Sequence, residues 1–174
     1  MSEITIEELS GRLGEVTVLD VRTAGEFDGS NGKPCDPRQG HIPGARNVDV
    51  YRLMNLDLAE IEVEELAARL GDVAVLDVRT PHEYDGSLGK PCDPRQGHIP
   101  GARNLDVYRL MDLTPDDVHK ALGLPAGAEV VAYCHGGSRS AIAAQVLRSL
   151  GYEARNYVGS WHEWSRHDDL PLER

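Results

Sequence analysis

The chain has 174 residues, enough for one domain with a substantial core or for two small ones. With 40% hydrophobic and 27% charged residues its composition is that of a globular protein, and no apolar run approaches the ~18 residues of a membrane-spanning helix. The formal net charge of −11 argues against nucleic acids and anionic membranes as partners, so an anion-binding site would have to be a local positive feature.

The N-terminus and the cysteines both favour a reducing compartment. Residues 1–4 lack the basic start and apolar core of a signal peptide, so we expect a cytoplasmic protein. The three cysteines, Cys35, Cys92 and Cys134, form no closely spaced pair. We therefore expect reduced thiols, neither a disulfide framework nor a zinc site, and no bound metal.

An internal repeat organises the chain. Residues 3–56 and 60–113 align without gaps at an offset of 57, and residues 32–47 recur unchanged at 89–104. Residues 114–174 occur once. The chain thus contains two copies of a first half and one copy of a second half.

Both copies of the first half predict the same elements. The first begins with an amphipathic helix over 4–13, in which Thr5 and Glu8 are spaced as a capping box; in the second copy Glu62 replaces the capping threonine. Runs of β-branched residues at 16–21 and 73–78 predict buried parallel strands. Three short elements follow in each copy: helical turns at 24–28 and 81–85, strands at 45–48 and 102–105, and helices at 50–53 and 107–110.

The second half continues the alternation of helices and strands. Thr114 and Pro115 predict the start of a helix that Gly123 ends. A strand at 129–133, a helix at 139–150, a strand at 154–158 and a turn or helix at 159–166 follow. This alternation predicts an α/β fold with a parallel sheet covered by helices on both faces. Ligands of such folds bind at the carboxyl ends of the strands, where Cys134 lies.

The stretch around Cys134 has the features of an anion-binding nucleophile loop. An apolar strand leads into the cysteine, two glycines follow, and an amphipathic helix begins near Arg139. Backbone N–H groups and the helix dipole would lower the pKa of the thiol, and Arg139 adds a fixed positive charge. The alternative is an ordinary buried cysteine before an ordinary turn. The coincidence of all these features favours the functional interpretation.

These residues resemble the rhodanese (sulfurtransferase) family. Residues 134–140 match its active-site pattern Cys, x, x, Gly, x, Arg, Ser, although His135 stands where many members carry Arg or Lys. Residues 76–84 with 97–102 resemble the family's N-terminal signature, and residues 157–164 its C-terminal one. By this resemblance, residues 58–174 are a complete catalytic domain and residues 1–57 a partial repeat without the active-site loop.

The resemblance implies a sulfurtransferase that needs no metal or organic cofactor. Cys134 would take sulfane sulfur from thiosulfate or a similar donor, carry it as a persulfide, and pass it to a thiol or to cyanide. The implied substrate-binding residues are His135, Gly136, Gly137, Ser138, Arg139, Ser140 and Arg79, with Asp77 and Trp161 in support. A cysteine phosphatase or arsenate reductase is the less favoured enzyme, because its loop is one residue longer. A non-catalytic module that binds a partner protein is the other alternative.

Several residues keep two interpretations. Arg79 either meets the substrate or pairs with Asp77 to tie strand to loop. Cys92 and its copy Cys35 are either second thiols that resolve the persulfide or plain loop cysteines. His98 is expected to be a structural hydrogen-bonding group, and Trp161 and Trp164 core or pocket rim.

Residues 1–57 have strand-like segments but no central strand or helix to bury them. They could dock on the complete domain or on another chain, exchange with residues 58–114 as partner of residues 115–174, or form a poorly ordered appendage. We favour docking or exchange in a homodimer. The other expected partners are the small sulfur donor and the acceptor thiol.

Overall fold

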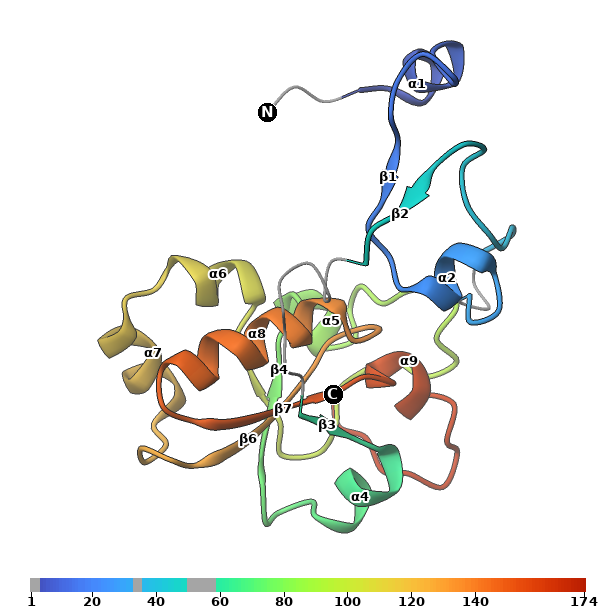
Figure 1. The fold of residues 1–174 in the computed structure, drawn as a ribbon. Coiled ribbons are helices and arrows are strands. Elements are labelled where there is room, and N and C mark those ends of the chain that lie inside the picture. The colour runs from blue at the N-terminus through green and yellow to red at the C-terminus, as the bar shows by residue number, and fades with distance from the viewer. Residues whose placement is uncertain (1–3, 33–35, 50–58) are drawn as a thin grey trace. The chain divides into compact units, whose positions relative to one another are not determined.

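The computed structural model describes residues 4–32, 36–49 and 59–174 (Figure 1). It divides into two compact units, residues 1–57 and residues 58–174, and each is described by itself.

The first unit contains short elements with regular local geometry. Helix α1 (Ile6–Gly11) begins at Thr5, which forms the expected capping box with Glu8. Strand β1 (Leu19–Asp20) pairs in parallel with β2 (Arg46–Asn47), and helix α2 (Ala24–Asp28) lies between them in the chain. The helix expected at 50–53 lies outside the described residues. The strands are shorter than the sequence predicts, with two residues each. They are also more exposed, because no described residue of this unit is buried.

The second unit is built on a five-stranded parallel sheet, which confirms the expected fold class. Its strands are β3 (Glu60–Ile61), β4 (Ala74–Asp77), β5 (Arg103–Asn104), β6 (Glu129–Tyr133) and β7 (Glu153–Tyr157), in the spatial order β3-β7-β6-β4-β5. In the centre, Leu76 of β4 lies opposite Ala132 of β6. Strand β3, a two-residue edge strand that pairs with β7, was not expected from the sequence.

Helices cover both faces of this sheet, as expected (Figure 1). Each face of the sheet has its own buried cluster. Successive side chains of β6 alternate between them: Val130 and Ala132 belong to one cluster, and Val131 and Tyr133 belong to the other. The first cluster includes residues of α6 (Val107–Asp112), α7 (Pro115–Leu122) and α8 (Ser138–Ser149). The second includes residues of α4 (Val63–Ala68) and α9 (Ser160–Trp164), and the short helix α5 (Pro81–Tyr84) follows β4.

Helix ends in the second unit follow the expected local signals. Thr114 caps α7, Pro115 is its first residue, and Gly123 ends it with a φ of 58°. Within the described residues, no helix has the length and apolar character needed to cross a membrane.

Candidate active site

Cys134 directly follows β6 and precedes α8, at the carboxyl edge of the sheet. Its side chain is almost completely buried. Its backbone N–H donates a hydrogen bond of 3.1 Å to Ser160 Oγ, and this hydroxyl donates to the carbonyl of Tyr157 at 2.7 Å. Ser160 has a φ of 55°, a left-handed conformation that is uncommon for a residue other than glycine. The first residue of α9, Ser160, therefore holds the backbone of Cys134 in place; Ser160 was not singled out from the sequence.

The loop after Cys134 surrounds the sulfur with donors. The N–H of Gly137 lies 3.1 Å from Sγ, and the hydroxyl of Ser140 lies 3.5 Å from it. Gly137 is the N-cap of α8 and has a φ of 90°. A Cβ added there would lie 2.8 Å from the carbonyl oxygen of Val158, so the close packing of this loop requires glycine.

These contacts favour the thiolate form of Cys134. Burial alone would raise the pKa of the thiol, because it disfavours the charged form. Hydrogen bonds from Ser140 and the backbone at Gly136, together with the charge of Arg139, outweigh the burial and hold the pKa of Cys134 below its ordinary value. A lowered pKa increases the thiolate fraction of Cys134, and the thiolate is the reactive form of a cysteine.

Arg139 is held by a carboxylate that the sequence analysis did not select. Its two terminal nitrogens donate to the two carboxylate oxygens of Glu83, each at 2.9 Å. Glu83 also accepts the N–H of Thr80 at 3.0 Å and so completes the capping box of α5. Burial would raise the pKa of Glu83, but Arg139 and the Thr80 N–H lower it to about 2, and the pair raises the pKa of Arg139. The sequence signal for Glu83 was its capping-box spacing from Thr80, which carries no information about Arg139.

The structure supports the framework interpretation of Arg79. This side chain is buried, and it forms an ion pair with Asp77 at 2.5 Å and donates to the carbonyl of Gly97 at 2.7 Å. Its guanidinium also lies over the rings of Tyr133 and Trp161, at 5.4 and 4.9 Å from their centroids. Its charge is enclosed within the fold, which favours the interpretation that Arg79 ties strand to loop; substrate binding by Arg79 stays a prediction.

His135 lies beside Asp93 and His162. Its Nε2 lies 3.2 Å from Asp93 Oδ1, and its ring meets that of His162 edge-on. This nitrogen is engaged by Asp93, so donation from His135 to a substrate anion stays a prediction. Ser138, also expected to be a donor, is the first residue of α8.

The remaining candidates have structural surroundings. His98 lies against the ring of Tyr84 and places Nδ1 3.0 Å from the Tyr84 carbonyl oxygen, as expected of a structural histidine. Trp161 and Trp164 are completely buried in the core. Cys92 is partly buried, with Sγ 3.9 Å from His135 Nε2, whereas Cys35 lies outside the described residues.

Comparison with known proteins shows the family to which the chain is similar. A family model described as a rhodanese-like domain matches residues 5–62 and 62–167. A thiosulfate sulfurtransferase of Pseudomonas aeruginosa is 38% identical over 121 residues, 63% of this chain and 44% of the relative. A crystal structure of a probable thiosulfate sulfurtransferase shares 45% identity and a TM-score of 0.58 over 66% of this chain and 47% of that chain.

A third relative is a substituted form of EanB, solved with ergothioneine covalently linked with a persulfide cysteine. It is 26% identical, with a TM-score of 0.62 over 68% of this chain and 28% of EanB. The chain therefore spans less than half the length of each of these three proteins. Because the family model matches more than half of its residues, the chain belongs to the rhodanese-like family.

Proposed function

We propose that residues 58–174 transfer sulfane sulfur through a persulfide on Cys134. The observation that carries the proposal is the environment of the Cys134 sulfur, a buried thiol that faces the Gly137 N–H at 3.1 Å and the Ser140 hydroxyl at 3.5 Å. This environment stabilises negative charge on sulfur, as thiolate or as persulfide. The names of the sulfurtransferase relatives support the same reaction class.

The reaction has two balanced steps. In the first, the Cys134 thiolate attacks the outer sulfur of thiosulfate; a new S–S bond forms, the sulfur–sulfur bond of the donor breaks, and sulfite leaves with the bonding electron pair. In the second, cyanide or an acceptor thiolate attacks the outer sulfur of the persulfide, and Cys134 leaves as thiolate. The first step needs the thiolate form of Cys134, which the lowered pKa of this thiol favours. No metal or organic cofactor takes part in either step of this proposal.

The direct test is the mass of the intact protein after brief incubation with thiosulfate. The wild type should gain one sulfur, about 32 Da, and lose it on addition of cyanide, because the persulfide is a covalent intermediate. The Cys134→Ser variant should gain nothing and should transfer no sulfur. Retained transfer by this variant would overturn the assignment. Failure of the wild type to gain mass with any sulfur donor would shift support to the partner-binding alternative.

The ionisation of Cys134 gives a second test. Its pKa lies below the ordinary value of 9.0, so the thiolate exists above that lowered pKa and is protonated as the pH falls through it. We expect the rate of Cys134 alkylation by iodoacetamide to reach its plateau at lower pH than that of a free cysteine, with modified sites resolved by peptide mass spectrometry. Ser140→Ala should move the midpoint upward, because it removes a donor to the sulfur. A midpoint at or above that of free cysteine would contradict the proposed activation.

A further inference from the structure

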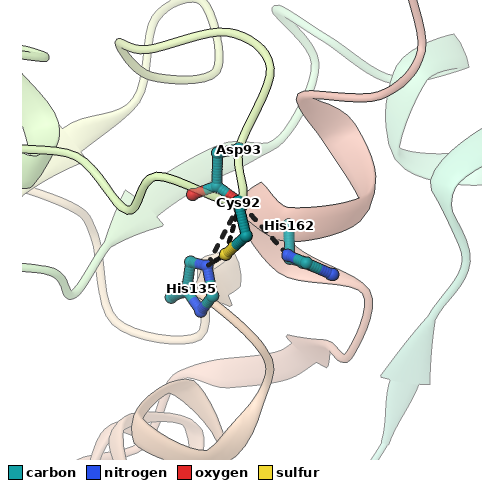
Figure 2. A group of neighbouring side chains, drawn as sticks. All are labelled: Cys92, Asp93, His135 and His162. Atoms are coloured by element: carbon teal, nitrogen blue, oxygen red, sulfur yellow. Dashed lines mark hydrogen bonds and ion pairs between the residues drawn. The ribbon is translucent and has the colours of Figure 1, made fainter. Parts of the chain in front are cut away.

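Four side chains that the sulfur transfer does not use meet beside the Cys134 loop (Figure 2). Cys92 and Asp93 belong to the loop before β5, His135 follows the nucleophile, and His162 lies on α9. One donor atom from each of the four lies within 4.8 Å of all the others. Three separate segments therefore converge on one small volume.

The distances suit a single tetrahedral ion. Asp93 Oδ1 lies 3.2 Å from His135 Nε2 and 3.1 Å from His162 Nδ1, and Cys92 Sγ lies 3.9 Å from both Asp93 Oδ1 and His135 Nε2. Zinc bonds of about 2.0–2.3 Å in a tetrahedron place neighbouring ligand atoms about 3.3–3.8 Å apart. These four pairs lie within a few tenths of an ångström of that spacing, and the other two pairs, at most 4.8 Å apart, would have to close by up to about 1 Å when the ion binds.

The donor set matches zinc in chemistry as well as in spacing. A thiolate, a carboxylate and two imidazoles combine sulfur, nitrogen and oxygen ligands, and zinc binds all three kinds. The Asp93 side chain is only 1% exposed, so its charge lies in the interior where a cation would complement it. We propose that Cys92, Asp93, His135 and His162 form a four-coordinate zinc site. All four ligands come from the protein, which is typical of a structural site and not of a catalytic one.

The backbone around the cluster is already fixed in the arrangement that the ion needs. Arg166 donates to the carbonyl oxygens of Cys92, at 2.7 Å, and of His162. The N–H of His162 donates to the carbonyl of His135 at 2.9 Å. Arg166 also lies 3.8 Å from Asp93 Oδ1, and its positive charge opposes a cation. The two negative ligands, thiolate and carboxylate, neutralise the ion's charge of two. The repulsion from the Arg166 side chain therefore acts on a site with no net charge.

The position of the site gives it a consequence for the active-site loop. His135 is the residue after Cys134, so an ion bound to its ring would anchor the beginning of the loop whose N–H groups face the sulfur. The same ion would tie that loop to α9 and to the loop before β5. The proposal reverses the expectation from sequence that the chain has no metal site. It does not depend on the sulfur-transfer proposal, because it concerns other side chains.

The internal repeat supplies a matched control. The first copy keeps the same pair of residues as Cys35 and Asp36, but it has no counterpart of residues 114–174 and hence none of His135 or His162. The first copy therefore has two of the four ligands, and the second copy has all four.

The test is a titration of the reduced, chelator-treated full chain with Co²⁺, followed by displacement with Zn²⁺. We expect one Co²⁺ per chain, a thiolate-to-cobalt charge-transfer band and the intense visible bands of tetrahedral cobalt, all abolished by one equivalent of Zn²⁺. Zn²⁺ should also raise the melting temperature, because it binds only the folded state. A wild type that binds no Co²⁺, or binds it without the thiolate band, overturns the proposal whatever the variants do.

The variants assign the ligands. Cys92→Ser should lose the charge-transfer band, and His162→Asn should weaken binding by at least about tenfold, the lower end of the effect of removing an outer-shell partner. Cys35→Ser and Cys134→Ser should bind as the wild type does. A band that survives Cys92→Ser and disappears in Cys134→Ser would place the ion on the nucleophile and overturn the proposal. Circular dichroism of each variant separates loss of a ligand from loss of the fold.

Discussion

The two copies of the first half form the same local structure from nearly the same sequence. In the first copy, Arg22 pairs with Asp20 at 2.5 Å and donates to the Gly40 carbonyl at 2.8 Å. The second copy repeats both contacts at its equivalent positions, 57 residues later, with 2.5 and 2.7 Å. The capping box of α2 recurs in α5, and the stacked histidine recurs as well, whereas the capping box of α1 has no counterpart in α4. Contacts within a short stretch of chain are therefore specified by that stretch alone.

Burial separates the copies. Leu19 is 56% exposed whereas its counterpart Leu76 is 1% exposed, and Ile42 is 42% exposed whereas Ile99 is completely buried. In the second copy, β6 pairs with β4 and extends the sheet toward β7. The same apolar residues form a core only where the second half of the domain is present. Docking or exchange of residues 1–57 in a dimer stays a prediction, which a monomeric mass in light scattering would exclude.

The two copies are expected to differ most in how much stability is lost when the aspartate of the aspartate–arginine pair is replaced. Asp77→Ala leaves the buried guanidinium of Arg79 without its partner, which should lower the free energy of unfolding by about 3–5 kcal/mol. Asp20→Ala removes the partner of Arg22, whose side chain is 41% exposed, and should cost about 0–1 kcal/mol. Urea unfolding followed by tryptophan fluorescence measures the stability of residues 58–174, in which both tryptophans are buried. Equal losses of unfolding free energy in the two variants would show that residues 1–57 unfold together with residues 58–174.

A slightly smaller difference is expected where only apolar contact changes. Leu76→Ala removes a completely buried side chain between two neighbouring strands and should cost about 2–5 kcal/mol, through lost burial and the cavity left behind. Leu19→Ala acts at an exposed position and should stay within about 0.5 kcal/mol. The same unfolding experiment compares them. A cost above 2 kcal/mol for Leu19→Ala would indicate that Leu19 is buried in solution, as docking or exchange would require.

The sequence predicted most of the fold, because its signals are local. The strand at 129–133 is β6, and the helix expected at 139–150 is α8, displaced by one residue. The exceptions depend on partners elsewhere in the chain. Strand β3 has two residues and exists through its pairing with β7, whose sequence lies more than 90 residues away. The strand expected at 16–21 has two paired residues, since a strand is only as long as its neighbour permits.

The candidate site divides in the same way. The residues of the loop from Cys134 to Ser140 are contiguous in the chain, so an anion-binding loop could be predicted from their spacing alone. Glu83, Ser160 and the four-residue cluster come together only in the folded sheet, at the carboxyl edges of separate strands. No spacing rule relates Cys92 to His162. The contact of His135 with Asp93 was not expected for the same reason, because the two residues are remote in sequence.

The smallest expected difference concerns the glutamate that caps each short helix. Glu83→Gln should keep the cap, since Gln also serves in a capping box, and should lose the ion pair with Arg139. We expect a cost of about 1–3 kcal/mol near neutral pH, measured by urea unfolding. Glu26→Gln is the matched control. Glu26 forms the same capping box with Thr23. The first half has no copy of residues 138–149, which supply Arg139.

The pH dependence of Glu83→Gln distinguishes the ion pair from a general packing defect. The pKa of Glu83 is lowered from 4.5 to about 2 in the folded protein, so its contribution to stability is complete above pH 4.5 and is lost as the pH falls toward 2. The difference between the wild type and Glu83→Gln should therefore shrink over this window, while Glu26→Gln stays close to the wild type throughout. A difference that is constant from pH 7 to pH 2 would show that the carboxylate charge does not hold Arg139, and that the two copies differ at this position in packing alone.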